Sequence, residues 1–498
     1  MKRRNKILLI EPLFHRLYKP SYSLDLYPLS LGYLAGAIKN NTDWEVMAYN
    51  ADFTPHSEKR SVVYETGEGF RRYLDNLKNP AAEIWNEVRS VIKDWRPDVV
   101  GITAKSQNFK SACIIAKIAK ECDKGTIVIM GGPHPSMVGE DIFACPEIDI
   151  GVKGEGEKTI VELLHAIRHD SGLQNISGVM YRTKDGVAEN ASQAYIDDLD
   201  SLRFPIENAK TALKDYGLYP KEAFRHIFAT RGCPYNCVFC GSRNIWSRRV
   251  RFRSPDNIIE EIKLCQSMGL KAVSFEDDYF GVTRKYVFDL CNSIIRQCPG
   301  LKWACEIHVK LVDEETIAIM KKAGCFSIRL GIESGNDEML KLIRKNITVE
   351  EALSAAKIIK KYSIDLHVFY MIGFPQETEE TLMDTFSQMK NIPCDLLIYS
   401  IFTPYPGTEA FDLCKKMGVI GESYDVALYN HQSPMNYFCP AISKERFREL
   451  AGLIEVTVDK KNRRNRIKRM FSSNILWRIK EKGILESLRK GLMTLAGK

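Results

Sequence analysis

Apolar and polar positions alternate with two different periods along the first 190 residues. Short runs rich in Ile, Val and Leu predict buried strands, and stretches with an apolar residue every three or four positions predict amphipathic helices between or after them. This alternation is typical of a parallel sheet with helices on both faces, so we expect a doubly wound α/β domain of Rossmann or flavodoxin type. The predicted strands are Lys6–Ile10, Trp44–Tyr49, Asp98–Thr103, Thr126–Gly131 and Ile148–Val152, and the predicted helices are Ser30–Lys39, Ala82–Asp94, Lys110–Cys122 and Glu157–His165.

Two features indicate where this first unit ends. Ser177–Tyr181 and Val187–Ala188 flank the turn-forming residues 184–186, which predicts a closing hairpin. The residues after the hairpin are mixed in pattern and interrupted by prolines. We therefore expect a domain over residues 1–190 and a linker over residues 191–225.

The alternation of strands and helices restarts at His226. Six apolar runs predict strands, and a helical pattern follows each of them. A complete barrel of this kind has eight strand–helix units, so residues 226–415 predict a partial, open-sided (β/α)6 barrel of TIM type. The six runs are His226–Thr230, Ala272–Phe275, Trp303–His308, Ser327–Leu330, Leu366–Met371 and Leu396–Phe402.

Polar or glycine-rich motifs follow five of these six runs. Active sites of TIM-type barrels form at the carboxyl ends of the strands, so the motifs are expected to meet at one site. They are the cysteine-rich stretch 231–241, Phe275–Phe280, Gly331–Gly335, Gly373–Thr378 and Thr403–Thr408. In the first domain, Gly131-Gly132-Pro133 and Gly154-Glu155-Gly156 follow strand ends in the same way, where doubly wound sheets bind ligands.

Composition agrees with an ordinary globular protein. The chain has 498 residues, of which 45% are hydrophobic and 27% charged, and its length suits two or three domains. The apolar run behind the basic N-terminus, Ile7–Ile10, is too short for a signal peptide, and no stretch is long enough to span a bilayer. Because the 14 cysteines show no disulfide-scaffold spacing, we expect a cytoplasmic, reducing location.

The net charge of +8 comes from the C-terminal end. Between Thr457 and Lys498 there are 13 Lys/Arg and three Asp/Glu, so the rest of the chain is slightly acidic. We therefore expect no nucleic-acid-binding surface and assign residues 416–498 to a mainly helical extension with a basic tail. Two interpretations of this tail stay open: a helix docked on the barrel with a solvated basic face, and a helix lying on an anionic membrane.

Cys233, Cys237 and Cys240 carry the strongest chemical signal. Their CxxxCxxC spacing offers three thiolates on one loop, and a metal cluster held by three thiolates keeps one iron free to bind a reacting molecule. Cys237 and Cys240 alone also form a CxxC, so a redox dithiol or half of a zinc site stays open. No second CxxC and no HxxxH pair accompanies it.

With these motifs in place, about residues 6–415 resemble the cobalamin-binding branch of the radical S-adenosylmethionine (SAM) enzymes. CxxxCxxC after the first barrel strand is the signature of that superfamily. Phe275–Phe280, Gly331–Gly335, Gly373–Thr378 and Pro404–Thr408 are similar to motifs of its cobalamin-binding branch. Tyr27–Leu34, Gly131–His134 and Gly154–Glu157 resemble that branch's cobalamin-binding domain.

The resemblance implies that the three cysteines hold a [4Fe–4S] cluster whose free iron binds SAM. Electron transfer to SAM then yields a 5′-deoxyadenosyl radical, and an electron donor such as flavodoxin or ferredoxin is expected as a partner. The implied SAM-binding residues lie on the barrel loops. They are Phe239, Asp277, Asp278, Glu333, Ser334, Gly373 and Pro375.

The resemblance also implies cobalamin on the strand ends of the first domain. The implied contacts are Ser30, Thr103, Ser106, Gly131, Gly132, Gly154, Glu155 and Gly156. Many cobalamin proteins with this type of sheet supply a lower axial imidazole from an Asp-x-His-x-x-Gly motif. This chain has no such motif, so the lower face of cobalt is expected to lack that ligand.

The function expected from the resemblance is methylation of an unactivated carbon through the radical and methylcobalamin. A radical cyclase, rearrangement or oxidation with the same cofactors is the alternative, and a non-catalytic cobalamin or iron–sulfur sensor is the non-enzyme alternative. The substrate is expected to be a small or lipid-linked molecule. The sequence carries no recognisable code for its identity.

Overall fold

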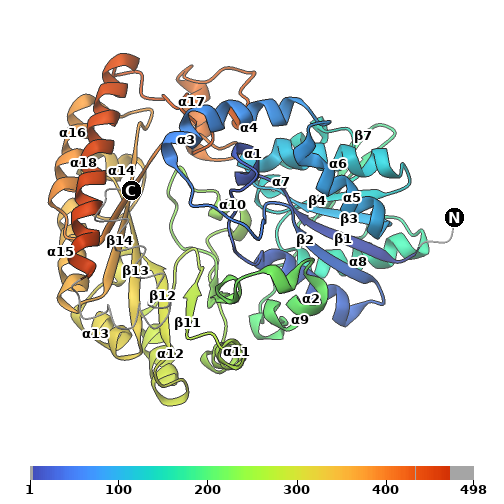
Figure 1. The fold of residues 1–498 in the computed structure, drawn as a ribbon, viewed down its shortest axis with the longest axis horizontal. Helices are drawn as coiled ribbons and strands as arrows, with labels where there is room; N and C mark the ends of the chain where they lie inside the picture. The colour runs from blue at the N-terminus through green and yellow to red at the C-terminus, as the bar shows by residue number, and fades with distance from the viewer. Residues whose placement is uncertain (1–3, 432, 471–498) are drawn as a thin grey trace.

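The computed structural model describes residues 4–431 and 433–470. It contains two large sheets, and Figure 1 shows them side by side, with the N-terminal sheet on the right and the barrel strands on the left. One hydrophobic cluster is continuous from a face of the N-terminal sheet into the barrel. A second cluster fills the other face of the N-terminal sheet.

The N-terminal sheet has seven strands in the order β2-β1-β3-β4-β5-β6-β7. The first five are parallel, and β6 and β7 form the antiparallel hairpin that the sequence predicted. The strands are β1 (Lys6–Glu11), β2 (Glu45–Asn50), β3 (Val99–Thr103), β4 (Ile127–Gly131), β5 (Ile150–Val152), β6 (Val179–Thr183) and β7 (Gly186–Glu189). The strand order reverses direction beside β1, as in doubly wound folds.

Helices cover both faces of this sheet. The four predicted helices correspond to α2 (Leu29–Asn41), α5 (Asn86–Trp95), α6 (Phe109–Cys122) and α8 (Gly156–His169). The sequence did not predict α1 (His15–Tyr18), α3 (Val62–Thr66), α4 (Glu68–Lys78) or α7 (Pro133–Val138). Three of these have only four to six residues, which is too short for a helical period to stand out.

The segment predicted as a linker contains a packed helix. Its α9 (Pro205–Ala212) lies against α2 and buries Ile206 and Ala209. Leu213 then pairs with Ala48 of β2 in an isolated parallel bridge. Pro205 stands at the first helical position, where proline is favoured, so the proline that suggested a break starts a helix instead.

The second sheet is the predicted six-stranded parallel array, with the order β15-β14-β13-β12-β11-β8. Its strands are β8 (His226–Ile227), β11 (Ala272–Phe275), β12 (Lys302–Ile307), β13 (Cys325–Glu333), β14 (Asp365–Ile372) and β15 (Leu396–Ile401). The first predicted strand is divided, because residues 230–231 leave β8 and pair as β9 (Thr230–Arg231) with β10 (Arg251–Phe252). The outer helices are α11 (Pro255–Ser267), α12 (Arg284–Gln297), α13 (Glu314–Lys322), α15 (Val349–Lys361), α16 (Glu379–Asn391) and α17 (Glu409–Lys416).

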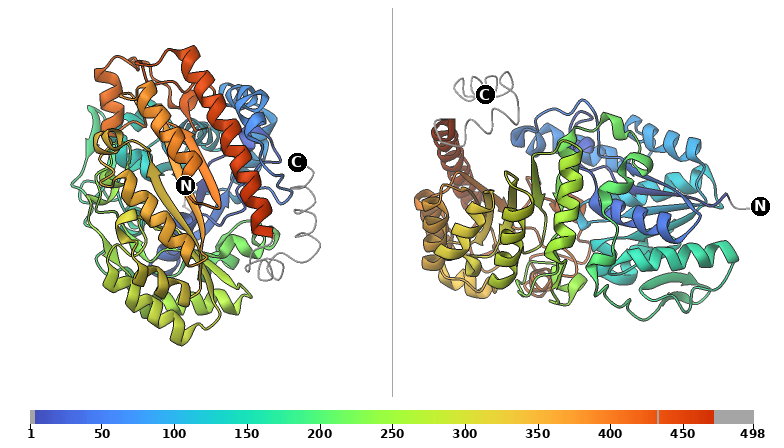
Figure 2. Two further views of the ribbon diagram at one scale, coloured as in Figure 1. Left: turned by 90° about the vertical axis from the view of Figure 1, so that its left-hand side faces the viewer. Right: turned by 90° about the horizontal axis from the view of Figure 1, so that it is seen from below.

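A long helix, α18 (Lys444–Met470), packs beside β15 and α16. Asn462 donates to the carbonyl of Leu397 at 2.7 Å and accepts from its amide at 2.8 Å, so one side chain satisfies both backbone groups of an edge-strand residue. Figure 2 shows α18 on the outer surface, on the side away from the N-terminal domain. None of the described helices is both long and apolar enough to cross a bilayer. The predicted tail beyond residue 470 lies outside the described residues.

Candidate functional site

A cavity of about 530 Å³ opens between the two sheets. Its N-terminal wall comes from the carboxyl ends of β3, β4 and β5 and from α2. Its barrel wall includes Arg231 and Gly232, at the start of the cysteine loop (residues 232–241), and Glu276 and Asp278, which follow β11. The two sets of strand ends that the sequence marked by separate motifs therefore face one common space.

Glycines form much of the N-terminal wall. Gly132 has φ +101°, and a Cβ there would lie 2.8 Å from the Thr103 hydroxyl. Gly154 has φ +74°, and no atom lies within 4 Å of where its Cβ would be. Both backbones therefore need glycine, and both present main-chain surface to a ligand. Behind them the cavity continues along apolar side chains that include Leu9, Ile129 and Ile160, so the wall suits a large ligand with an apolar part.

Seven of the eight predicted cobalamin contacts line this cavity. They are Ser30, Thr103, Gly131, Gly132, Gly154, Glu155 and Gly156. Ser106 does not belong to the lining. It is buried, and its hydroxyl lies 3.0 Å from Nδ1 of His134, so the serine positions the histidine. Among the described lining residues there is no histidine.

The cysteine loop is held by backbone contacts to distant segments. The amide of Val238 donates to the carbonyl of Ile343 at 3.2 Å, and the Val238 carbonyl accepts from Ala410 at 3.0 Å. Gly232 has φ +102°, and a Cβ there would lie 2.1 Å from the Arg249 carbonyl oxygen. A Cβ on Gly241 would lie 2.6 Å from Sδ of Met137 in α7, so the loop packs directly on the N-terminal domain.

The three loop cysteines differ from the other cysteines in exposure. Cys240 is exposed and Cys233 and Cys237 are partly buried, whereas nine of the remaining 11 are buried. Burial raises the pKa of Cys233 to about 11 and also raises that of Cys237. A metal cation bound to a thiol deprotonates it, so these three accessible sulfurs fit a bound iron–sulfur cluster. No group of three His, Cys, Asp or Glu within the described ranges is arranged to hold a single metal ion.

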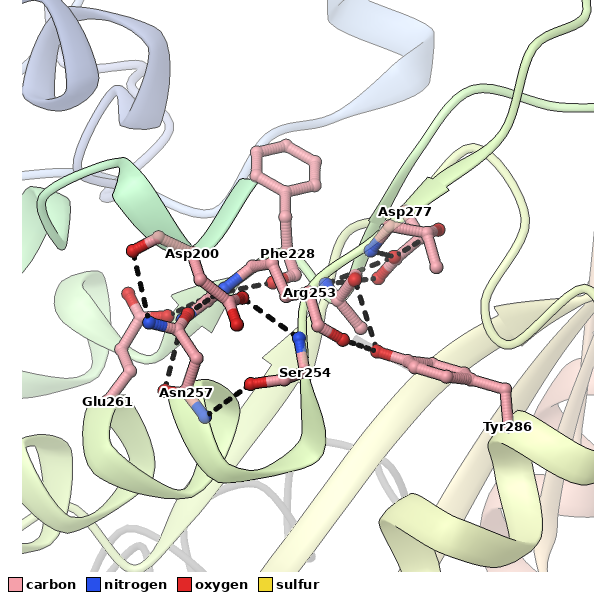
Figure 3. A network of polar contacts seen from close by, with 10 residues as sticks. Asp200, Phe228, Arg253, Ser254, Asn257, Glu261, Asp277 and Tyr286 are labelled. Carbon is pink, nitrogen blue, oxygen red and sulfur yellow. Dashed lines mark hydrogen bonds and ion pairs between the residues drawn. The ribbon is translucent and has the colours of Figure 1, made fainter. Parts of the chain in front are cut away.

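The four residues before the loop are fixed from several sides (Figure 3). Buried Arg253 donates to the carbonyl of Phe228 at 2.6 Å and to Glu261 at 2.5 Å. The Tyr286 hydroxyl donates to the carbonyls of Ala229 and Arg253 at 3.2 and 2.8 Å. The chain that enters the cysteine loop therefore has little conformational freedom.

Asp277 belongs to the same anchor. Its carboxylate accepts from the amides of Ala229 and Thr230 and from the Thr230 hydroxyl, the last at 2.6 Å. Burial raises its pKa to about 7, although these hydrogen bonds act in the opposite direction. The neighbouring Asp278 is exposed, lines the cavity and accepts from Ser242 at 2.8 Å. Of the two predicted aspartates, only Asp278 therefore faces the cavity.

Four charged side chains, each no more than 11% exposed, join the two domains beside the cavity. Glu155 accepts from Arg231 at 2.7 Å and from Arg251 at 2.6 Å, and Glu157 accepts from Arg231 at 2.6 Å. We call Glu155, Glu157, Arg231 and Arg251 the interdomain ion-pair network. Burial alone would raise the pKa of Glu155, but Arg251 and Arg231 outweigh it and the pKa is lowered.

Aromatic rings cover this network. The Arg231 guanidinium lies 4.9 Å from the ring centre of Tyr33, and that of Arg251 lies 5.4 Å from Trp246. Tyr33 and Trp246 also line the cavity. Because Arg231 directly precedes Gly232 and Cys233, the network fixes the first cysteine relative to the N-terminal strand ends.

The inner face of the barrel carries a second charged group. Glu276 accepts from the Ser274 hydroxyl at 2.6 Å and contacts His226 at 2.9 Å and Arg329 at 3.2 Å. The other side of Arg329 faces Glu306 at 3.6 Å. Burial raises the pKa of Glu306. Glu276 is the member of this group that reaches the cavity.

Glu333 lies close to the cysteines. It has φ +73° beside an irregularity in the β13–β14 register and pairs with buried Lys345 at 3.0 Å. Burial alone would lower the pKa of Lys345, but Glu333 and Cys237 raise it, so the ammonium stays charged. A Cβ on Gly331 would lie 2.6 Å from a Glu333 oxygen. The glycine of this motif therefore makes room for the ion pair.

The remaining predicted SAM contacts do not line the 530 Å³ cavity. Phe239 packs on Phe374, with ring centres 5.9 Å apart, and Pro375 is buried. Ser334 is fully buried against Thr385 of α16 at 3.0 Å, which gives it a packing role. Gly373 has φ +85°, and its amide donates to buried Glu377.

Sequence reasoning missed several residues of the site. The structure places Arg231 between two carboxylates, a position that no motif predicts. Tyr33, Trp246, Arg251, Glu276 and Lys345 were not singled out. Tyr33 and Glu276 lie inside the motifs Tyr27–Leu34 and Phe275–Phe280, but these motifs do not indicate what the two side chains contact. Trp246, Arg251 and Lys345 belong to none of the motifs, so only the three-dimensional contacts identify them.

Comparison with known proteins gives two domain matches. Residues 227–389 match the radical SAM superfamily, and residues 16–164 match the B12 binding domain. An uncharacterized methyltransferase of Pyrococcus horikoshii is 30% identical over 82% of this chain and 82% of its own length. The anaerobic magnesium-protoporphyrin IX monomethyl ester cyclase of Rubrivivax gelatinosus is 27% identical over 73% of this chain and 66% of its own length.

A solved structure shares the architecture. The radical SAM methyltransferase TsrM of Kitasatospora setae, solved with cobalamin and a [4Fe–4S] cluster, superposes with a TM-score of 0.68. The match covers 92% of this chain and 89% of the TsrM chain at 17% identity. The likeness confirms the predicted fold class, with a cobalamin-binding type of domain followed by a radical SAM type of barrel.

Proposed function

Because this chain belongs to the cobalamin-binding radical SAM enzymes, we propose that it is a methyltransferase that methylates an unactivated carbon. The cofactors of such an enzyme are a [4Fe–4S] cluster, SAM and cobalamin. When bound, they supply reductive cleavage of SAM, hydrogen abstraction from the substrate and a transferable methyl group. The protein's residues position these groups and exclude competing reactions.

The shared cavity is the observation that carries the proposal. A methyl transfer requires the group that carries the methyl and the group that activates the substrate to reach the same carbon. Here one space is bounded by the cobalamin-type strand ends and by Gly232 at the start of the cysteine loop. The relative from Pyrococcus horikoshii, named a methyltransferase, supports the same activity.

We propose roles for the site residues on this basis. Cys233, Cys237 and Cys240 would ligate the cluster, and Asp278, Glu333, Phe239 and Gly373 would border bound SAM. The glycine-rich wall would hold cobalamin, through Ser30, Thr103, Gly131, Gly132, Gly154 and Gly156. Glu155 would act by fixing Arg231 and Arg251, both within 2.7 Å.

The charged groups would keep the site ordered. Arg329 holds Glu276 toward the cavity, and Lys345 presents a positive charge near Cys237, which favours its thiolate form. Tyr33 and Trp246 shield the interdomain ion-pair network from water on the cavity side. An electron donor such as flavodoxin or ferredoxin would reach the cluster at the exposed Cys240.

A radical cyclase is the second candidate. The cyclase of Rubrivivax gelatinosus shares 27% identity with this chain, a value close to that of the named methyltransferase. Both reactions need the same cofactors, so the cavity alone does not separate them. Methyl transfer adds one CH₂ unit to the product and consumes a second SAM.

The test is anaerobic reconstitution with iron, sulfide and hydroxocobalamin, followed by incubation with SAM, a reductant and candidate small molecules. Methyl transfer predicts 5′-deoxyadenosine and S-adenosylhomocysteine together, and a product heavier by one CH₂ unit. Deoxyadenosine with no S-adenosylhomocysteine would contradict the methyltransferase and favour the cyclase. The Cys233→Ala variant is the matched control and is expected to give neither deoxyadenosine nor methylated product.

A further inference from the structure

The outer face of α18 carries exposed apolar and cationic side chains at helical spacing. Leu453 and Val456 are 49% and 51% exposed, and Lys460, Arg463 and Arg464 follow on the same face and are also exposed. These five residues, which we call the α18 outer face, follow the i, i+3, i+7, i+10, i+11 pattern of one side of a helix. The opposite side is buried on the barrel.

Two other cations of the helix are engaged with the barrel. Lys461 donates to the carbonyls of Met389 and Ile392 at 2.7 and 2.6 Å, at the C-terminal end of α16. Arg469 contacts Asp365 at 3.2 Å. By contrast, the side chains of Lys460, Arg463 and Arg464 form no ion pair or hydrogen bond with any of residues 4–431 and 433–470. The outer cations are therefore available to a partner.

The position of these cations restricts what that partner can be. Phe447, near the start of α18, lies against Gly373 just beyond the carboxyl end of β14, whereas Arg469 reaches Asp365 at its amino end. The basic part of α18 therefore lies at the amino edge of the barrel, and the cysteine loop lies at the carboxyl edge. An acidic electron donor bound at this basic part would sit at the edge opposite its acceptor.

We propose that the α18 outer face binds the surface of an anionic lipid bilayer. Apolar side chains mixed with unpaired cations on one exposed helix face suit the boundary between headgroups and acyl chains. The sequence continues the same composition after residue 470, with six Lys/Arg, two Asp/Glu and Trp477 in 28 residues. A membrane on this side leaves the carboxyl edge of the barrel free for substrate and reductant.

The experiment is co-sedimentation of the full-length protein with vesicles of phosphatidylcholine alone or mixed with phosphatidylglycerol, at low and high salt. Binding is expected only to the anionic vesicles and is expected to fall at high salt. The Arg463→Glu/Arg464→Glu variant is expected to bind at least about 30-fold more weakly, because each cation lost near an anionic surface costs about fivefold and the two new carboxylates add repulsion. Thermal unfolding and iron content should equal those of the wild type, because both side chains are exposed.

The matched control is Arg71→Glu/Arg72→Glu. These two arginines are also adjacent and exposed, on α4 of the N-terminal domain. The control changes the net charge equally and is expected to bind vesicles like the wild type. Equal loss in both variants, unchanged binding of the α18 variant, or binding to duplex DNA and not to vesicles would overturn the proposal.

Discussion

Removing the central carboxylate of the interdomain ion-pair network should loosen the cysteine loop. Glu155 is 2% exposed and accepts from two guanidinium groups and from the amide of Ile196 at 2.8 Å. Glu155→Gln keeps the shape but leaves two buried cations with Glu157 as the one remaining carboxylate of the network. Removing one partner of a buried ion pair costs about 3–5 kcal/mol, and because Gln keeps part of the hydrogen bonding we expect about 3 kcal/mol.

Hydrogen exchange of backbone amides measures the loss of stability in the segment that enters the cysteine loop. If the peptides that contain residues 228–233 exchange through local opening, about 3 kcal/mol corresponds to roughly a hundredfold faster exchange. The control is Glu189→Gln. Glu189 pairs with Lys153 at 2.6 Å near the surface, where the Glu189 side chain is 45% exposed and that of Lys153 is 31% exposed. Such surface pairs contribute about 0–1 kcal/mol, so the control should exchange like the wild type. Equal exchange in both variants would refute a fixing role for the network.

Three further predictions concern the cluster, the cavity wall and a buried carboxyl. Elemental analysis of anaerobically purified protein should find no bound iron in Cys233→Ala. The control Cys298→Ala, at a buried cysteine away from the loop, should keep its iron. Gly132→Ala should weaken cobalamin binding at least tenfold in equilibrium dialysis, because the new Cβ would lie 2.8 Å from the Thr103 hydroxyl. The control Gly139→Ala, also at positive φ but with no atom within 4 Å of the new Cβ, should bind cobalamin like the wild type. Burial raises the pKa of Glu377 to about 7, so the folded protein holds this proton more tightly than the unfolded chain. Its contribution to stability is full below the unfolded pKa of about 4.3 and is lost as pH rises through 7. Between about pH 5 and about pH 9 the free energy of unfolding of the wild type should therefore fall by about 2–3 kcal/mol relative to that of Glu377→Gln. Urea unfolding at several pH values measures this, and an equal pH dependence in the two proteins would contradict it.

The sequence was sufficient for the parallel sheets because their strands are buried on both faces and stand out as apolar runs. Lys6–Ile10 and Leu366–Met371 correspond to β1 and β14 within one or two residues. The closing hairpin was also predictable, since Asp185-Gly186 is a strong turn signal. Short helices such as α1 and α7 escaped because four to six residues do not establish a period.

The sequence indicated the parts of the site where a motif fixes the backbone. It did not indicate which residues the side chains contact. Gly131, Gly132 and Gly154 line the cavity as expected, because a glycine at a strand end marks a close approach of the chain. Asp277 and Asp278 look equivalent in the sequence, yet only the second faces the cavity. The hydrogen bonds that Asp277 accepts from Ala229 and Thr230 hold its carboxylate away from the cavity, and the sequence does not show these contacts.

Glu155 is a second residue whose side-chain partners the sequence does not show. Its motif predicted a cofactor contact, and it does line the cavity, but its carboxylate is engaged with Arg231 and Arg251, which lie 76 and 96 residues away in the chain. No local pattern connects residues at such separation. The ion pairs follow from how the two domains pack, which is settled by a large shared apolar surface.

Electron paramagnetic resonance of the reduced, reconstituted protein tests most directly whether one cavity serves both cofactors. Cobalamin in its paramagnetic Co(II) state reports on a second paramagnet nearby through faster spin relaxation. A shared cavity predicts faster Co(II) relaxation in the wild type than in Cys233→Ala, which should bind cobalamin but no cluster. Identical relaxation in the two proteins, with cobalamin bound to both and the cluster present in the wild type, would contradict the account.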